Sequence, residues 1–236
     1  MVTLFHIPHS PWSERARWAL DHTPVPHRRV LYTSMVTEPR LRWRLGRATG
    51  RITLPVLLTD DGPLEDSVDI ARWAAQRGGP ALGADLDDVR ALAEEALDVG
   101  RVRTTQRVVA NAEQLRASLP GFLQPLGPIG LAVGRKAGAD LLRKYPVGDD
   151  DLVARMRAAL EGLQTWTQAH PPDTLTVTHI LAATALAFVR PVAEWANVPE
   201  AAAPGWEEPE LTAAFADLVA WRDALYSAHR RGPAAV

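Results

Sequence analysis

Apolar positions in the first eighty residues follow two different patterns. Short apolar runs flanked by turn residues are typical of strands, and apolar residues three or four apart are typical of a helix. Asp61 and Gly62 lie between two apolar runs, and an Asp-Gly pair favours a hairpin turn there. The patterns predict a strand, a helix, a strand, a basic connecting segment, two strands and a helix, at 2–7, 13–21, 27–32, 38–47, two runs within 52–66, and 67–76. This β-α-β, β-β-α order indicates a compact α/β unit.

The pattern changes after this unit. Beyond Leu86, apolar residues recur at helical spacing and no alternating strand pattern returns. We therefore expect two domains, an α/β domain over 1–80 and an all-helical domain over 86–232. The apolar stretch Ile180–Val189 is shorter than the ~20 residues that cross a bilayer, so it predicts a buried core helix. The tail from Arg230 onward is expected to be frayed. The predicted helices cover 86–118, 130–144, 150–169, 176–190 and 210–229.

Composition and charge narrow the possible function classes. The 236 residues carry a net charge of −2 with a pI near 6.4, so the chain lacks the basic surface of a nucleic-acid binder. It contains no cysteine, which excludes disulfides, thiolate metal sites and a protein thiol nucleophile. The histidines do not have metal-ligand spacing, so no metal is expected. The first residues do not read as a signal peptide, which favours the cytoplasm and no membrane partner.

The sequence Ser10-Pro11-Trp12-Ser13 stands between the first strand and the first helix. Proline is favoured at the first helical position because its missing N–H would be unpaired there, which makes Ser10 the predicted N-cap. A helix N-terminus carries partial positive charge and free N–H groups, so it stabilises an anion placed beside Ser10. Taken alone, the stretch favours a capping role worth ~1 kcal/mol.

Three separated stretches match a known family in order and spacing. "LFHIPHSPWSERARWALD", "TLPVLL" and "EDSVDIARW" resemble the N-terminal, thioredoxin-like half of the cytosolic glutathione transferase superfamily. The helical second half agrees with the C-terminal domain of that family, so the resemblance covers nearly the whole chain. It implies an α/β, thioredoxin-like N-terminal domain (βαβ-ββα) followed by an all-α C-terminal domain, and a homodimer.

The resemblance also implies a serine-type enzyme, in which a hydroxyl holds the sulfur of glutathione as a thiolate. Some classes place this serine at the position of Ser10 and others place a serine or cysteine at that of Ser13, so both are candidate catalytic residues and Ser10 is favoured. Lowering a thiol pKa from about 8.5 to about 6.5 takes roughly 2.7 kcal/mol. A hydrogen bond to a charged group supplies ~1.5–3 kcal/mol and a helix terminus ~0.3–1 kcal/mol, which together suffice.

Other matched residues are candidates for binding glutathione. The resemblance implies a cis peptide bond before Pro55, which exposes the backbone of Leu54 to the cysteinyl part. The family binds the γ-glutamyl end at the position of Asp66 and Ser67, where Ser67 and helix N–H groups suit the carboxylate and Asp66 suits the ammonium group. Ser67 is also a good N-cap, and the two roles are compatible. Arg51 is the candidate for the glycyl carboxylate.

Trp12 and His9 are the candidates for contacting the second substrate, since both flank the favoured serine. One motif departs from the family: at the start of the core helix, Thr176 is followed three residues later by His179 where an Asp is usual, which is a poorer capping box. Four tryptophans at helical spacing are expected in the core or between domains: Trp18, Trp73, Trp166 and Trp221.

The predicted activity is that of a glutathione transferase, with glutathione as co-substrate and a small hydrophobic electrophile bound against the helical domain. The absence of cysteine argues against the thiol-transferase and dehydroascorbate-reductase branches, which need a protein thiol. A glutathione-dependent isomerase or dehalogenase uses the same thiolate, so this alternative stays open. Use of another small thiol and a non-catalytic ligand-binding or interaction role on the same fold stay open as well.

Overall fold

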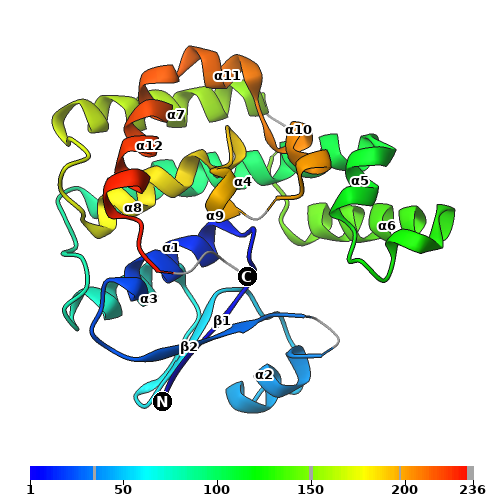
Figure 1. Ribbon diagram of the computed structural model, residues 1–236, viewed down its shortest axis with the longest axis horizontal. Coiled ribbons are helices and arrows are strands. Elements are labelled where there is room, and N and C mark those ends of the chain that lie inside the picture. The colour runs from blue at the N-terminus through cyan, green and yellow to red at the C-terminus, as the bar shows by residue number, and fades with distance from the viewer. Residues whose placement is uncertain (34–35, 149–150, 197, 233–236) are drawn as a thin grey trace.

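The computed structural model describes residues 1–33, 36–148, 151–196 and 198–232 (Figure 1). The strands and helices predicted in the N-terminal part are all present, and one helix lies within the basic connecting segment. Their bounds are β1 (Val2–His6), α1 (Pro11–Asp21), β2 (His27–Leu31), α2 (Glu38–Leu45), β3 (Val56–Thr59), β4 (Gly62–Leu64) and α3 (Ser67–Ala75).

The four strands form one mixed sheet in the order β2-β1-β3-β4. β1 and β2 run parallel, with Val2 opposite His27, and α1 provides the crossover between them. β3 is antiparallel to both of its neighbours, with Phe5 of β1 opposite Val56. Parallel strands need such a crossover, whereas β3 and β4 are joined by a tight turn at Asp60 and Asp61, after which Gly62 begins β4 opposite Thr59. The arrangement is that of a thioredoxin-like domain, as the family resemblance implied.

The second half of the described chain is helical, as expected. Figure 1 shows α5 and α6 extending to one side of the other helices. The helices are α4 (Leu86–Ala110), α5 (Ala112–Ser118), η1 (Gln124–Leu126), α6 (Pro128–Lys144), α7 (Leu152–Ala169), α8 (Val177–Thr184), η2 (Ala185–Phe188), α9 (Ala193–Ala196), η3 (Glu200–Ala202), α10 (Ala203–Trp206), α11 (Pro209–Ala214) and α12 (Ala216–His229).

The predicted helix over 86–118 is two helices, because Asn111 interrupts it. Asn111 has an extended backbone with φ −104° and ψ 115°, and its side chain accepts a hydrogen bond of 3.0 Å from the amide of Glu113. A side chain that bonds its own backbone in this way ends one helix and begins the next. The periodicity of apolar positions does not detect such a break.

Two other predicted helices are also divided. The helix predicted over 210–229 is interrupted at Phe215, and the one predicted over 176–190 changes to a 3-10 turn after Thr184. The predicted start of the helix over 150–169 falls on a residue outside the described ones. These differences shift boundaries and leave the order of elements unchanged.

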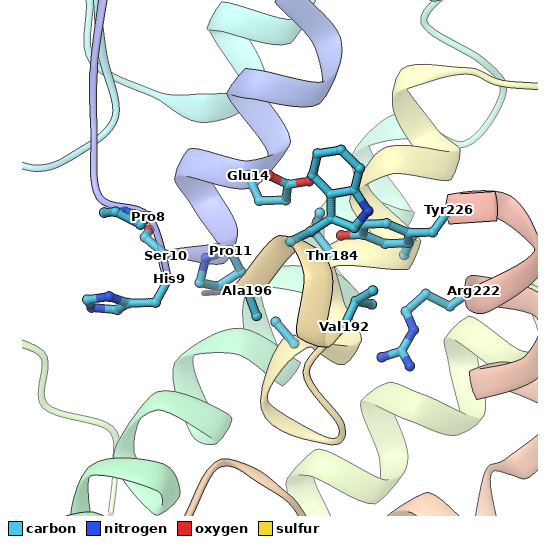
Figure 2. A pocket seen from close by; sticks show the side chains of 13 residues that line it. Pro8, His9, Ser10, Pro11, Glu14, Thr184, Val192, Ala196, Arg222 and Tyr226 are labelled. Atoms are coloured by element: carbon cyan, nitrogen blue, oxygen red, sulfur yellow. The ribbon is translucent and has the colours of Figure 1, made fainter. Parts of the chain in front are cut away.

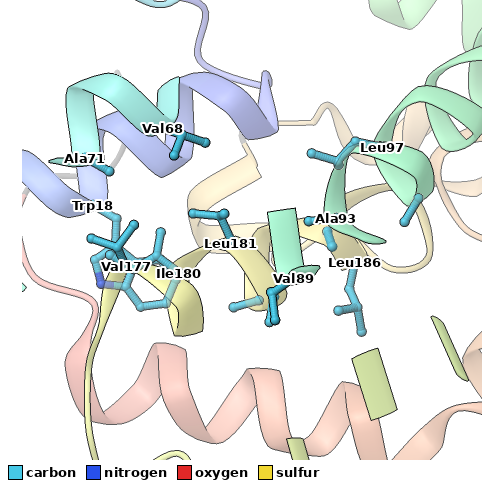
Figure 3. Packing of buried hydrophobic residues seen from close by; sticks show 14 of the residues in the cluster. Trp18, Val68, Ala71, Val89, Ala93, Leu97, Val177, Ile180, Leu181 and Leu186 are labelled. Carbon is cyan, nitrogen blue, oxygen red and sulfur yellow. The ribbon is translucent and has the colours of Figure 1, made fainter. Parts of the chain in front are cut away.

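One hydrophobic cluster runs through both halves of the chain (Figure 3). Trp18 of α1 and Ala71 of α3 contribute to it from the N-terminal part, and Leu97 of α4 and Ile180 of α8 contribute from the helical part. The helices α1 and α3 thus cover one face of the sheet and pack on α8 with their other side. The predicted core tryptophans belong to this cluster or pack against it: Trp18, Trp73, Trp166 and Trp221.

A smaller cluster lies on the opposite face of the sheet, under α2. It consists of Phe5, Leu41, Ile52 and Val56, all buried. Both faces of the sheet are therefore covered by helices, which is what a buried parallel strand pair requires. None of the helices in the described ranges is long and apolar enough to cross a membrane.

Candidate active site

Four chain connections meet at one edge of the sheet. β1 and β2 are parallel and end at this edge, β3 begins there because it is antiparallel to β1, and β4 ends there because it is antiparallel to β3. The loop that ends at Ser10 follows β1, Leu54 and Pro55 precede β3, and Asp66 follows β4. Residues that are far apart in the sequence are thus brought to the same edge by the strand topology.

Ser10 is the N-cap of α1, as predicted. Its backbone is extended, Pro11 is the first helical residue, and its Oγ accepts a hydrogen bond of 3.3 Å from the amide of Ser13. The amide of Glu14 donates to the carbonyl of Ser10 at 2.9 Å. Among the described residues no backbone group accepts from the Trp12 amide, so this N–H in the first turn is available to a ligand.

Ser13 has a different environment from Ser10. Its side chain is fully buried, and its Oγ accepts a hydrogen bond of 3.1 Å from the amide of Ile7. Ser10 is partly exposed. The Ser13 hydroxyl therefore fixes the loop between β1 and α1 from inside the protein, and the Ser10 hydroxyl lies nearer the surface.

A buried arginine also fixes this loop. Arg17 donates to the carbonyl oxygens of Ile7 and Pro8 at 3.1 and 2.9 Å. Glu14 pairs with Arg17 at 2.7 Å and with Arg230 at 2.6 Å. The prediction of a frayed tail was wrong for Arg230, whose side chain is buried, and residues 233–236 lie outside the described part.

His6 belongs to the same buried group and does not line the site. Its Nδ1 lies 3.0 Å from the guanidinium of Arg17. Burial, the charge of Arg17 and then that of Arg29 lower the pKa of His6 to about 4. His6 is therefore neutral near pH 7 and can accept the Arg17 hydrogen bond.

The peptide bond between Leu54 and Pro55 is cis, as the resemblance implied. Pro55 is buried and Leu54 is partly exposed. The antiparallel register begins at Val56, which lies opposite Phe5, so Leu54 lies just beyond the paired strands. Its backbone is thus placed at the sheet edge beside the start of α1.

Asp66, not Ser67, is the N-cap of α3, which corrects the capping role considered for Ser67. Asp66 Oδ1 accepts from the amides of Val68 and Asp69 at 2.8 and 3.2 Å, and its Oδ2 pairs with Arg90 at 3.1 Å. A carboxylate caps a helix well because it also interacts favourably with the helix dipole.

Ser67 is buried, and its Oγ accepts a hydrogen bond of 3.2 Å from Arg15 of α1. Arg15 is also buried and pairs with Glu94 of α4. Its Nε and Nη2 atoms have no hydrogen-bond partner among the described residues. Because Ser67 Oγ accepts from this arginine, its own hydrogen remains free to be donated to another group.

Aromatic side chains continue from α1 into the helical half. Trp12 donates to Glu94 at 2.7 Å, and its ring lies 6.4 Å from that of Phe188. Phe188 stacks on Trp206 at 5.5 Å, and Trp206 meets the ring of His9 edge-on at 5.7 Å. Trp12, Phe188, Trp206 and His9 thus form an aromatic row next to Ser10.

A small cavity lies behind the start of α1. It is lined by residues that include Ser10, Glu14 and Tyr226, and Figure 2 shows the His9 ring pointing away from most of the side chains that line it. Its volume of about 20 Å³ is enough for a water molecule and far too small for an organic substrate.

A much larger hollow of about 330 Å³ opens between α2, the loop before Pro55 and the end of α6. Arg42, Arg51 and Lys144 line it, together with Glu38, which pairs with Arg42 at 2.7 Å. The Arg51 guanidinium lies 4.3 Å from the centre of the Tyr145 ring. The predicted residue Arg51 therefore lies at the same edge of the sheet as Leu54.

Comparison with known proteins identifies the N-terminal part. Residues 9–77 match the model of the glutathione S-transferase N-terminal domain. The match covers the α/β part of the chain and makes residues 9–77 similar to the N-terminal domain of glutathione S-transferases.

Solved structures of glutathione S-transferases share the fold over nearly the whole chain. A glutathione transferase from Phanerochaete chrysosporium is 16% identical, with 98% of each chain covered and a TM-score of 0.57. A possible glutathione S-transferase from Rhodopseudomonas palustris is 18% identical, covers 96% of this chain and 94% of its own, and has a TM-score of 0.53.

A third match, from Ceriporiopsis subvermispora, was solved in complex with glutathione. It is 17% identical, covers 94% of this chain and 98% of its own, and has a TM-score of 0.52. A search of curated proteins found no match.

Several residues of this glutathione S-transferase fold could not be recognised as site residues from the sequence. Contacts between different helices connect Ser67 to Arg15 and, through it, to Glu94. A contact of the same kind connects Asp66 to Arg90. One signal was present: two arginines, Arg15 and Arg17, alternate with core residues on the first helix, and a buried arginine must be paired. No group of three or more potential metal ligands occurs within the described ranges.

Proposed function

We propose that this protein is a glutathione transferase in which Ser10 holds the sulfur of glutathione as a thiolate. The observation that supports this most is the meeting of Ser10, the cis Leu54–Pro55 bond and the Asp66–Ser67 pair at one edge of the sheet. These are the positions that the family resemblance assigns to the thiol, the cysteinyl backbone and the γ-glutamyl group.

Two donors of α1 favour a thiolate at this place. The Ser10 hydroxyl is partly exposed, and the Trp12 amide has no backbone acceptor among the described residues. A hydrogen bond to a charged group contributes ~1.5–3 kcal/mol and the helix terminus ~0.3–1 kcal/mol. Ser13 is the weaker candidate, because its hydroxyl is buried and already accepts from Ile7.

The proposed contacts of the γ-glutamyl group use the start of α3. The hydroxyl of Ser67, oriented by Arg15, donates to the α-carboxylate, and the exposed side of Asp66 accepts from the ammonium group. The backbone of Leu54 pairs with the cysteinyl unit. Arg51 is the proposed partner of the glycyl carboxylate, because it lines the hollow next to Leu54.

The second substrate is a small electrophile that lies against the aromatic row, with Trp12 and His9 as proposed contacts. The sulfur of glutathione attacks the electrophile and forms a conjugate. The enzyme holds the two substrates close together and stabilises the thiolate. We also propose a homodimer in the cytoplasm, as the family resemblance implies.

The test is glutathione binding by calorimetry, with the ultraviolet absorbance of the thiolate recorded across pH. We expect Ser10→Ala to bind glutathione and to lose the thiolate signal at neutral pH, and Ser10→Thr to retain part of it because the hydroxyl is kept. Ser118→Ala is the matched control, since Ser118 is exposed on α5 and its hydroxyl donates to the Gln114 carbonyl of the same helix.

Two outcomes would contradict the proposal. Loss of the thiolate signal in Ser13→Ala with an unchanged signal in Ser10→Ala would transfer the role to Ser13. Absence of glutathione binding by the parent protein would leave Ser10 as a helix cap and would favour another thiol or a non-catalytic role.

A further inference from the structure

Three cationic side chains surround one tyrosine next to the aromatic row. The ring centre of Tyr145 lies 3.8 Å from the Arg101 guanidinium carbon, 4.3 Å from that of Arg51 and 5.3 Å from the Lys144 ammonium nitrogen. We call these four residues the cationic corner. They come from α4, α6 and the loop before Pro55, so only the folded chain brings them together.

The cationic corner has more positive charge than its neighbours neutralise. Arg101 pairs with Asp98 at 2.6 Å, and Lys144 lies 3.4 Å from the Ile52 carbonyl oxygen. Within the described ranges, neither Arg51 nor Lys144 has a carboxylate within ion-pair distance. Like charges held this close repel one another, so an anion placed among them is stabilised.

The phenol of Tyr145 responds to this field. Burial raises its pKa, but a hydrogen bond from Arg51 and the charges of Lys144, Arg51 and Arg101 outweigh burial, so that the pKa lies below its ordinary value. The same field acts on any anionic group that comes near the ring. The Nε atom of Arg101 is buried and has no hydrogen-bond partner among the described residues.

Arg101 joins the cationic corner to the aromatic row. Its guanidinium also lies over the ring of Trp12, 4.8 Å from the ring centre. Trp12 is two residues after Ser10, in the first turn of α1. Phe188 is buried behind Trp12, which is partly exposed, so an aromatic molecule that lies against the accessible part of Trp12 has one end directed toward Arg101 and Tyr145.

We infer that the second substrate of this protein is an aromatic electrophile that carries an anionic group, and that Arg101, Tyr145 and Lys144 bind this group. This inference rests on the proposed function and specifies its substrate class. The aromatic row contributes apolar contact, and the cationic corner contributes hydrogen bonds that are stronger to an anionic oxygen than to the oxygen of a neutral electrophile. A carboxylate or sulfonate has the required chemistry.

The test compares 4-chloro-3,5-dinitrobenzoate with its neutral methyl ester as electrophiles for glutathione. In both reactions the sulfur–carbon bond forms, the carbon–chlorine bond breaks, chloride leaves with the bonding electrons, and the thiol proton passes to solvent. Each kcat/KM is divided by the uncatalysed rate constant with glutathione, which removes the difference in intrinsic reactivity.

We expect the parent protein to prefer the carboxylate by about tenfold or more, since one charge-assisted bond contributes ~1.5–3 kcal/mol. Arg101→Gln should remove most of this preference through a higher KM for the carboxylate, and Arg101→Lys should restore part of it. Lys144→Met should reduce the preference by a smaller factor. Arg143→Gln is the control, because Arg143 is an exposed neighbour on α6 that pairs with Asp140.

Two results would overturn the inference. One is an unchanged preference in Arg101→Gln. The other is a higher KM for glutathione in Arg101→Gln and Lys144→Met with an unchanged KM for the carboxylate, which would assign the cationic corner to glutathione itself.

A calorimetric titration with 3,5-dinitrobenzoate in the absence of glutathione separates this inference from the proposed function. Binding that Arg101→Gln weakens would support the anion site even if no conjugation is observed. No binding by a protein that conjugates the neutral ester would overturn the anion site and leave the proposed function in place.

Discussion

The two sides of the candidate site are held in place by different kinds of contact. On the strand side, the loop to Ser10 is fixed by bonds that stay inside the protein, from Ser13 and Arg17. At the cationic corner, which α4 and α6 form together with the loop before Pro55, Arg51 and Lys144 are exposed and contact mainly one tyrosine. The first arrangement fixes the position of Ser10 before a ligand arrives, whereas the second leaves charged donors that a ligand can use.

The largest expected effect tests the strand side. Glu14→Gln removes the carboxylate that pairs with both Arg17 and Arg230. Among the described residues this leaves the buried Arg17 without a carboxylate partner and leaves Arg230 with Asp21 alone. Breaking a buried ion pair from one side costs about 3–5 kcal/mol. We expect a decrease of this size in the free energy of unfolding, measured by urea denaturation.

Asp98→Asn is the matched change on the helical side. The Asp98 side chain is 45% exposed, and Arg101 is its one ion-pair partner among the described residues, so its loss should cost no more than about 1 kcal/mol. Equal losses in the two variants would contradict the contrast between the two sides.

A second effect depends on pH. The folded pKa of His6 is about 4, below its value of 6.5 in the unfolded chain, so folding favours the neutral imidazole. Its contribution to stability is complete above about pH 6.5 and decreases as the pH falls toward 4. We expect His6 to account for about 2 kcal/mol of the stability lost between pH 7.5 and pH 5.

The variant His6→Gln isolates this contribution, because glutamine does not titrate and keeps an acceptor for Arg17. Urea denaturation at the two pH values should show a smaller loss in the variant than in the parent. Parallel losses in both proteins would exclude His6 as the source.

The smallest effect concerns the start of α3. Asp66→Ala removes the N-cap and should lower the free energy of unfolding by about 1 kcal/mol, whereas Asp66→Asn keeps a capping oxygen and should cost less. Glutathione affinities of the two variants, measured by calorimetry, then separate the capping role of Asp66 from the role of its negative charge in binding. If Asp66 accepts from the ammonium group, both variants weaken binding, although only the alanine variant loses the cap.

The parts of the site that depend on neighbouring residues could be predicted from the sequence. Ser10 before Pro11 predicted the cap of α1, and the sequence pair Asp61-Gly62 predicted the hairpin, whose turn lies at Asp60 and Asp61. Asp66 and Ser67 were placed at the start of α3, although the capping residue is Asp66. Each of these features follows from the conformational preferences of a few consecutive residues.

The parts that depend on distant residues could not be predicted in this way. Arg15 and Glu94 are 79 positions apart, and Trp12 and Glu94 are 82 positions apart. Tyr145 and Arg101 meet only because α4 and α6 pack together. Periodicity shows that a helix has a buried face, but it does not show which side chain of another helix that face will meet.

The pair between Glu14 and Arg230 has a consequence for biosynthesis. The two residues are 216 positions apart in the sequence, and a ribosome releases the N-terminal part of a chain first. The start of α1 therefore emerges long before its buried counter-charge has been made. The nascent chain can form the sheet early. The buried ion pairs of Glu14 that support the loop at Ser10 are complete only after the segment that carries Arg230 has left the ribosome.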